Sequence, residues 1–440
     1  MIAHSAAARI AQVSPRTSRS MNRPMLDAER ETSPREAPNS CRRHAAPLVV
    51  LAVLLLTYSL TATWTGPYHG DAYTNAVTGW YLAETGSVIA TDHGALTTPE
   101  QHGNFSWFVA SPRGPISQYP PGAAALAAVF YLFDSREAPI SYLSGTNRPD
   151  LEPVPLPSPS TWPATASAVF ATALAGAIVT RVVSNLGATS RQAIVTGLTW
   201  GLATTAWSVA SNMSWTHGPA MLCISLAMLA ASRDRWLLTG LSLGLAILVR
   251  PHLALIALVV GCLVGFRRRD WRPLVGVGFG SFLGLAGLLT YNFWVWGRLT
   301  ISGGYGSSFS ERFVGGSLEW FAGNVVGALI DFDHGVLPWA PFLVVLVAAA
   351  VMSNRESPVW STAFAIGGAL YLLVQLRANR FSGGDGHFAY RYPLETLTAA
   401  APWLFVGYRR WVRERPVMNM AVIATVLLAA VAQAWAALQT

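Results

Sequence analysis

The chain has 440 residues, of which 52% are hydrophobic and only 12% are charged. Soluble domains carry about 25% charged residues, so this composition and a mean hydropathy of +0.37 indicate a membrane protein. The net charge of +8 is typical of arginine-rich cytoplasmic loops, and we expect no nucleic-acid partner. The three cysteines show no CxxC spacing, which argues against a disulfide framework or a cysteine metal site.

The first 46 residues differ in composition from the rest of the chain. Residues 1–46 are rich in Ser, Pro, Arg and Ala, with eight Arg against four acidic residues, and we predict a disordered cytoplasmic tail. The following apolar run begins too late for a signal peptide, and no cleavage site follows it. Residues 47–440 are predicted to form one transmembrane domain with extracytoplasmic loops at 65–161, 297–335 and 377–391.

Apolar segments recur along the whole of this domain, which predicts an all-α, polytopic transmembrane helical bundle. Segment 121–133 is short for a span, which needs about 20 residues, so we expect a helix that lies along the membrane surface. About 11 spans then remain, with 10 to 13 possible. The expected spans are 47–64, 162–182, 192–210, 217–231, 236–249, 251–266, 273–296, 336–352, 358–376, 392–407 and 417–437.

The charges of the loops favour this arrangement. With 121–133 outside the bilayer, the cytoplasmic loops hold 13 Arg against four acidic residues, and the outer segments hold nine Arg against 14 acidic residues. Such an excess of arginine marks the cytoplasmic side, which places the N-terminus inside and the protein in the plasma membrane. Segments 236–249 and 251–266 should form a hairpin with Arg250 at its outer tip, because Pro251 breaks the helix.

Polar residues collect in the outer segments. Asp71 follows the first span, where partial burial would favour a catalytic base, although Asp is also a common helix N-cap. His217 opens a span and is either a substrate or metal ligand or a structural residue. Arg250 and His252 sit at the expected hairpin tip, where Arg250 either binds a lipid phosphate or extends to the interface.

Two further motifs precede expected spans. Asp331, Asp333 and His334 have residue types that bind divalent ions, but their spacing is equally compatible with an interfacial loop. The segment 380–393, RFSGGDGHFAYRYP, combines glycines with charged and aromatic residues, and we favour a binding role over a plain turn. Its candidate substrate-binding residues are Asp385, His387, Tyr390 and Arg391.

The order of these features resembles the GT-C superfamily of polytopic membrane glycosyltransferases, and most closely its uncharacterised actinobacterial members. The resemblance covers most of residues 47–407. It rests on a first span followed by an acidic loop and a Pro-Pro juxtamembrane helix, and on the stretches GLAILVRPHLAL (243–254), DHGVLPWAPF (333–342) and SGGDGHFAYRYPLE (382–395).

The resemblance implies transfer of a sugar from a polyprenyl-phosphate donor to an acceptor hydroxyl on the extracytoplasmic side. It implies that Asp71 is the catalytic base, and that Arg250 and Arg391 are candidates for the donor phosphate. The acceptor would be a cell-envelope glycan, lipid or protein, and membrane lipids would surround the bundle. Many members have two adjacent acids where this chain has Gly70-Asp71-Ala72, so a divalent metal is possible but not required.

Other functions are compatible with the same sequence. A lipid-linked sugar translocase or transporter would place ionisable groups near the middle of the bilayer and would often contain inverted repeats, which we do not find. A non-catalytic GT-C-like binding protein is the third alternative, and the single acid at Asp71 leaves it open. No GxGxxG, Walker, HExxH or GxSxG motif occurs, which argues against nucleotide-driven transport and soluble-type hydrolase chemistry.

Overall fold

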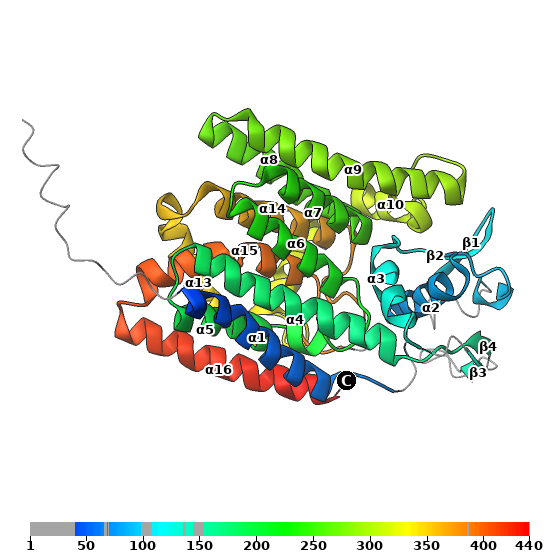
Figure 1. Cartoon of the computed structure of the whole chain (residues 1–440), viewed down its shortest axis with the longest axis horizontal. Coiled ribbons are helices and arrows are strands. Elements are labelled where there is room, and N and C mark those ends of the chain that lie inside the picture. The colour runs from blue at the N-terminus through cyan, green and yellow to red at the C-terminus, as the bar shows by residue number, and fades with distance from the viewer. Residues whose placement is uncertain are drawn as a thin grey trace, which may run out of the picture.

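The computed structural model describes residues 40–65, 68, 70–97, 107–134, 138–143, 154–384 and 387–439. Among these residues the fold is all-α, with 15 helices of at least seven residues and two small β-hairpins at one end of the molecule (Figure 1). Most of the expected tail 1–46 lies outside the described residues. The longer helices are α1 (Ser40–Thr61), α2 (Gly70–Thr85), α3 (Gly122–Tyr131), α4 (Trp162–Asn185), α5 (Ser190–Leu202), α6 (His217–Ala231), α7 (Trp236–Val249), α8 (Ala254–Arg268), α9 (Trp271–Trp296), α10 (Ser308–Gly315), α11 (Leu318–Ile330), α13 (Phe342–Met352), α14 (Val359–Ala378), α15 (Pro393–Gly407) and α16 (Pro416–Gln439).

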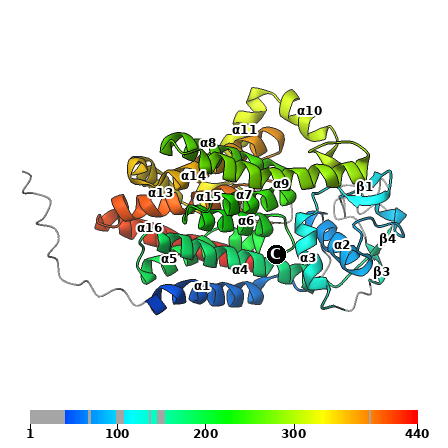
Figure 2. The same cartoon turned by 45° about the horizontal axis from the view of Figure 1, so that its top comes forward.

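Five of the described helices are long and apolar enough to cross a membrane: α4, α8 with the preceding turn Pro251–Leu253, α9, α14 and α16. The pair α10 and α11, bent by 100°, would make a sixth (Figure 2). The protein is therefore a multi-pass membrane protein by length and composition. Several other expected spans form shorter helices, because breaks interrupt them. Segment 192–210 divides into α5 and the π-helix Ala206–Ala210 (η2), and segment 336–352 divides at Pro341 into α12 (Val336–Trp339) and α13.

Burial varies strongly between the helices. α4 lies inside the bundle, where 78% of its most apolar 18-residue stretch is buried. In α9 and α16, only 17% and 28% of the equivalent stretch are buried. The exposed faces of α9 and α16 carry large apolar side chains such as Phe282 and Leu427. Apolar surface of this extent needs a non-aqueous surrounding, and a lipid bilayer supplies it.

The hairpin expected around Arg250 is present. α7 runs parallel to α9, whereas α8 runs antiparallel to α9. α7 and α8 are therefore antiparallel to each other, as in a hairpin. α7 and α9 approach through facing glycines: a Cβ on Gly284 would lie 2.2 Å from the carbonyl oxygen of Gly244. Small residues allow membrane helices to pack with their backbones in contact, which fixes the hairpin tip relative to α9.

α2 and α3 form a cap over one end of the bundle, together with the β-hairpins (Figure 1). Strand β1 (Phe108–Ser111) pairs antiparallel with β2 (Gly114–Ser117), and β3 (Ile140–Leu143) pairs antiparallel with β4 (Val154–Pro157). α3, the segment expected at the membrane surface, has ten residues and packs against α2 and α4. The cap therefore rests on the bundle through α3 and holds α2 above the ends of the long helices.

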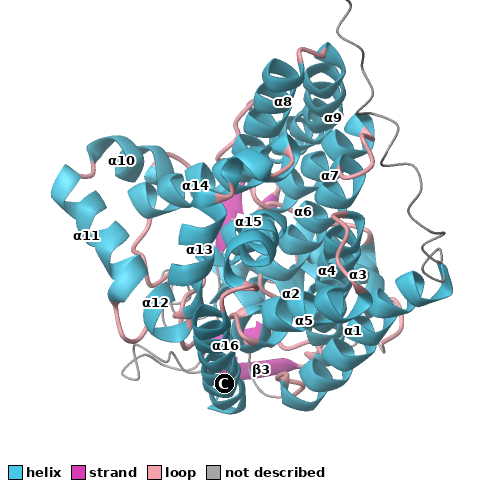
Figure 3. Cartoon of the chain, turned by 90° about the vertical axis from the view of Figure 1, so that its left-hand side faces the viewer, coloured by secondary structure: helices cyan, strands magenta, loops and turns pink. Residues whose placement is uncertain are grey.

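The loops with many arginines gather at the opposite end. Arg409 Nη1 donates to the carbonyl oxygen of Leu186 at 2.6 Å, and Arg410 pairs with Glu356 at 2.8 Å. These contacts join three of the expected cytoplasmic loops, and Figure 3 views the bundle from this end. At least three of the loops expected on the cytoplasmic side thus meet at the end of the bundle opposite the cap.

Candidate functional site

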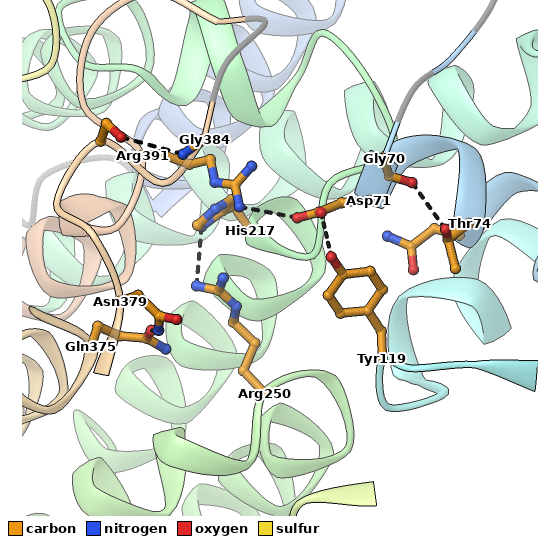
Figure 4. Close-up of polar contacts among 12 residues, drawn as sticks. Gly70, Asp71, Thr74, Tyr119, His217, Arg250, Gln375, Asn379, Gly384 and Arg391 are labelled. Atoms are coloured by element: carbon orange, nitrogen blue, oxygen red, sulfur yellow. Dashed lines mark hydrogen bonds and ion pairs between the residues drawn. The ribbon is translucent and has the colours of Figure 1, made fainter. Parts of the chain in front are cut away.

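Polar side chains from five elements meet where the cap contacts the bundle (Figure 4). They come from the first turn of α2, the segment before α3, the start of α6, the α7–α8 hairpin tip and the start of α15. Four residues predicted from the sequence are among them: Asp71, His217, Arg250 and Arg391. Because these elements are distant in the sequence, the site is formed only by the folded chain.

Asp71 lies at the centre of the first group of contacts. Its Oδ2 accepts a hydrogen bond from Arg391 Nη2 at 3.0 Å, and its Oδ1 accepts one from the hydroxyl of Tyr119. The residue before it, Gly70, has φ of +54°, which orients the first turn of α2 toward the bundle. A carboxylate in the first turn of a helix is also favoured by the helix dipole. Asp71 is therefore a nearly buried carboxylate with a cation and a proton donor as its partners.

Arg391 is buried, and aromatic rings surround its guanidinium group. The ring centroid of Trp215 lies 4.6 Å from its Cζ and that of Tyr392 lies 5.5 Å away, both within the range of cation–π attraction. Burial alone lowers the pKa of Arg391, but Asp71 together with Tyr392 and Tyr119 raises this pKa above its ordinary value. Arg391 is thus a permanent cation. Its Nε has no hydrogen-bond partner among the described residues, which leaves donor capacity for an anion.

The glycine-rich segment before Arg391 lies directly against the guanidinium group. Gly383 has φ of +78°, and a Cβ at this position would lie 3.2 Å from Arg391 Nε. A side chain here would press on the guanidinium group and would also strain the backbone. The absence of a side chain at Gly383 thus allows the backbone to approach Arg391 closely.

A second group of contacts surrounds Glu395, which is fully buried in the first turn of α15. Its Oε1 accepts from Arg250 Nη1 at 2.9 Å and from His217 Nδ1 at 2.8 Å. Arg250 Nη1 also donates to the hydroxyl of Tyr371 at 2.6 Å. Because a carboxylate only accepts, His217 carries its proton on Nδ1, and its Nε2 has no partner within the described residues.

Tyr392 connects the two groups. Its ring centroid lies 5.5 Å from the guanidinium carbon of Arg391 and 5.8 Å from that of Arg250. The site therefore contains two guanidinium groups next to one aromatic ring, each paired with a buried or nearly buried carboxylate. Such an arrangement can bind an anion at the guanidinium groups and accept a proton at a carboxylate, provided that a ligand replaces one of the internal pairs.

The remaining predicted residues have different surroundings. His252 lies beside Arg250 in sequence, 3.4 Å from Gln375 through its Nδ1 and with its ring 4.5 Å from that of Phe309. The ring of His387 lies 6.1 Å from that of Trp215, which packs against the guanidinium group of Arg391, and 5.5 Å from the ring of His334. His252 and His387 thus border the site.

Of the two other candidates from the glycine-rich segment, the structure describes only Tyr390, which takes part in none of the polar contacts above. Tyr390 is only 1% exposed and packs in an apolar cluster with residues of α13, α15 and α16, so its ring has no free face for a sugar. It was expected to face a ligand, but the positive φ of +65° at Ala389 turns the chain inward immediately before it. Asp385 lies outside the described residues.

The structure describes no group of three His, Cys, Asp or Glu side chains that could hold a metal ion within the described ranges. The possible divalent site at 331–334 contains a 3.8 Å contact between His334 Nδ1 and Asp331 Oδ1. Asp331 Oδ1 also accepts from the backbone amides of Asp333 and His334, at 3.0 and 2.8 Å. Those contacts are typical of a turn that caps its own backbone.

Five residues of the site were not among the candidates predicted from the sequence: Tyr119, Trp215, Tyr371, Tyr392 and Glu395. Glu395 could have been predicted, because an acidic residue inside an apolar helix is costly unless it is paired with a cation. Such a residue therefore indicates a buried ion pair. Tyr119 and Trp215 had no such signal, since aromatic residues are frequent throughout this chain and belong to its membrane interfaces as often as to a site.

In comparisons with known proteins, no family model matches the chain and no curated protein matches it. The resemblance to the membrane glycosyltransferases therefore stays a prediction from the sequence.

Proposed function

We propose that the protein is a membrane glycosyltransferase of the GT-C type, which moves a sugar from a polyprenyl-phosphate donor to an acceptor hydroxyl. The observation that supports this function best is the Asp71–Arg391 pair, a carboxylate and a cation held together at one end of the bundle. A base for the acceptor and a cation for the leaving phosphate are the two groups that such a transfer needs.

In the proposed reaction, Asp71 takes the proton of the acceptor hydroxyl. The acceptor oxygen then forms a bond to the anomeric carbon, and the bond between that carbon and the phosphate oxygen breaks. The electron pair remains on the polyprenyl phosphate. Arg391, whose Nε has no partner among the described residues, stabilises the charge on the phosphate, and Arg250, which also lies next to the ring of Tyr392, assists it.

The resting contacts specify what has to change when substrates bind. Both oxygens of Asp71 are occupied, one by Tyr119 and one by Arg391. A phosphate that attracts Arg391 would free Oδ2 for the acceptor hydroxyl, so donor binding would prepare the base. We propose that His217 and His387 orient the sugar or the acceptor, which is a cell-envelope glycan, lipid or protein.

The proposed topology follows the charges. The end of the bundle that carries the arginine-rich loops is the cytoplasmic end, so the site lies on the extracytoplasmic side of the plasma membrane. About 11 spans would then cross the bilayer, with the shorter apolar helices completing the five or six long ones. The N-terminus would be cytoplasmic.

Turnover of synthetic polyprenyl-phosphate sugars in membranes tests this function. Asp71→Asn keeps the size of the side chain and removes the base, so transfer is expected to be abolished while membrane insertion persists. Asp92→Asn, an exposed carboxyl of the same outer segment, is the matched control and should retain full activity. A parallel assay with a chelator determines whether a divalent metal takes part. Full activity in Asp71→Asn would refute the role of Asp71.

A translocase is the second candidate, because the 100° bend between α10 and α11 is typical of the broken helices of transporters. The same membranes discriminate the two functions. A translocase would move the lipid-linked sugar between leaflets without breaking its glycosidic bond, and a non-catalytic binding protein would retain the lipid and do neither.

A further inference from the structure

A recess runs along the side of the bundle, from the level of Leu397 near the start of α15 to Tyr408 at its arginine-rich end. It is formed by α5, α13, α15 and α16, which contact one another (Figure 3), and its volume is about 350 Å³. We call it the α5–α16 groove. Its lining is almost entirely apolar and includes Val195, Leu198, Leu346, Leu404, Val422 and Val426.

The groove opens toward the outside of the bundle. Val195 on one side of the opening is 55% exposed, and Leu427 on the other side is 62% exposed. α16 has most of its apolar surface unburied, so in a membrane this opening faces lipid. A recess of this size, lined by apolar side chains and open to the bilayer, fits a hydrocarbon chain.

Two arginine side chains, Arg191 and Arg409, lie at one end of the same groove. Arg191 precedes Val195 by one helical turn on α5 and therefore shares its face. It is exposed, and it has no hydrogen bond or ion pair among the residues that the structure describes. The guanidinium carbon of Arg409 lies 5.5 Å from the ring centroid of Phe405, which also lines the groove.

Two acidic residues of the arginine-rich loops are already paired with other arginines. Glu356 contacts Arg410 at 2.8 Å, and Glu414 contacts Arg413 at 3.6 Å. Arg409 donates only to the backbone carbonyl of Leu186 in the contacts described. Arg191 and Arg409 thus retain positive charge beside the end of an apolar groove.

We propose that the α5–α16 groove binds one anionic phospholipid, with an acyl chain along the groove and its phosphate at Arg191 and Arg409. Guanidinium groups recognise phosphate through charge-assisted hydrogen bonds, and a phospholipid carries the anion and the hydrocarbon in one molecule. The proposal does not rest on the transferase reaction, because none of the residues that line the groove belongs to the candidate site.

Native mass spectrometry of the full chain, released from detergent with phosphatidylglycerol or phosphatidylcholine, measures the bound lipid. We expect one phosphatidylglycerol per protein, retained better than phosphatidylcholine. Arg191→Gln should weaken the retention roughly tenfold, as expected for one lost charge-assisted hydrogen bond. Arg272→Gln, an exposed arginine at the start of α9, is the matched control and should change nothing.

A second pair of variants tests the groove itself. Val426→Trp fills it and should abolish retention of the lipid, whereas Leu428→Trp, on the exposed face of the same helix, should not. If Val426→Trp does not fold, Ile423→Trp enters the groove from the exposed side, one turn away. Equal retention of the two lipids, unchanged binding in Arg191→Gln, or lipid retained in the tryptophan variants would overturn the proposal. So would a dimer that these variants dissociate, since a second copy would then occupy the groove.

Discussion

Arg391 and Glu395 lie four residues apart at the start of α15, yet they pair with oppositely charged partners on different parts of the molecule. Arg391 contacts Asp71 on the cap, and Glu395 contacts Arg250 on the α7–α8 hairpin. Two residues at the beginning of α15 therefore neutralise charges of opposite sign, the carboxylate of Asp71 and the guanidinium group of Arg250. This arrangement fixes the cap, the hairpin and α15 relative to one another around Tyr392.

The geometry of the Asp71–Arg391 pair depends on the planar fork of arginine. Arg391→Lys keeps the charge but loses the orientation above Trp215, so transfer should fall roughly 10- to 100-fold, the cost of a charged hydrogen bond of about 1.5–3 kcal/mol. Arg380→Lys, an exposed residue of the same segment, should behave as the unchanged protein. The measurement is kcat/KM with a polyprenyl-phosphate sugar, and equal values for both variants would contradict this role of Arg391.

Removal of Glu395 should act on stability. Glu395→Gln leaves the guanidinium group of Arg250 buried without its counter-charge, and breaking a buried pair in this way costs about 3–5 kcal/mol. Thermal unfolding in detergent is therefore expected at a clearly lower temperature. The double variant Glu395→Gln with Arg250→Met removes both charges and should recover part of the loss. A double variant that is no more stable than the single one would show that the pair is not the cause.

Tyr119 is expected to position Asp71 as a hydrogen-bond donor. Burial, and then the charge of Asp71, raises the pKa of Tyr119 well above its ordinary value of 10.0. Its hydroxyl thus stays protonated up to pH 10. The rate of transfer should therefore not fall below pH 10 through deprotonation of Tyr119. Tyr119→Phe should lower kcat roughly tenfold, as one hydrogen bond of about 1.4 kcal/mol would. Tyr291→Phe on α9 is the control.

The contact between α7 and α9 should be sensitive to the size of one residue. A side chain at Gly284 would collide with the backbone of Gly244, so Gly284→Leu should destabilise the protein by about 1–3 kcal/mol through overpacking. Gly278 is on the same helix, and a Cβ there would meet nothing within 4 Å. Gly278→Leu should consequently leave the unfolding temperature unchanged, and a similar loss in both variants would refute the packing argument.

Residue pattern and charge predicted the helical class, the hairpin at Arg250 and four residues that the structure places in the site, Asp71, His217, Arg250 and Arg391. Each of these follows from local rules, such as a proline break or an arginine at a helix end. The lengths of the spans did not follow, because a break such as the π-helix Ala206–Ala210 contains no proline and depends on tertiary packing. The burial of Tyr390 could not be predicted from the sequence either, because it results from the backbone conformation of Ala389.

The distance in sequence between Asp71 and Arg391 has a consequence for biosynthesis. The two residues are 320 positions apart, so Asp71 is synthesised and placed at the membrane long before its cation exists. During that interval only Tyr119, among the partners described, is available to the carboxylate. The site becomes complete when the start of α15 is inserted, which couples its formation to the arrival of nearly the whole chain and leaves prematurely terminated products without it.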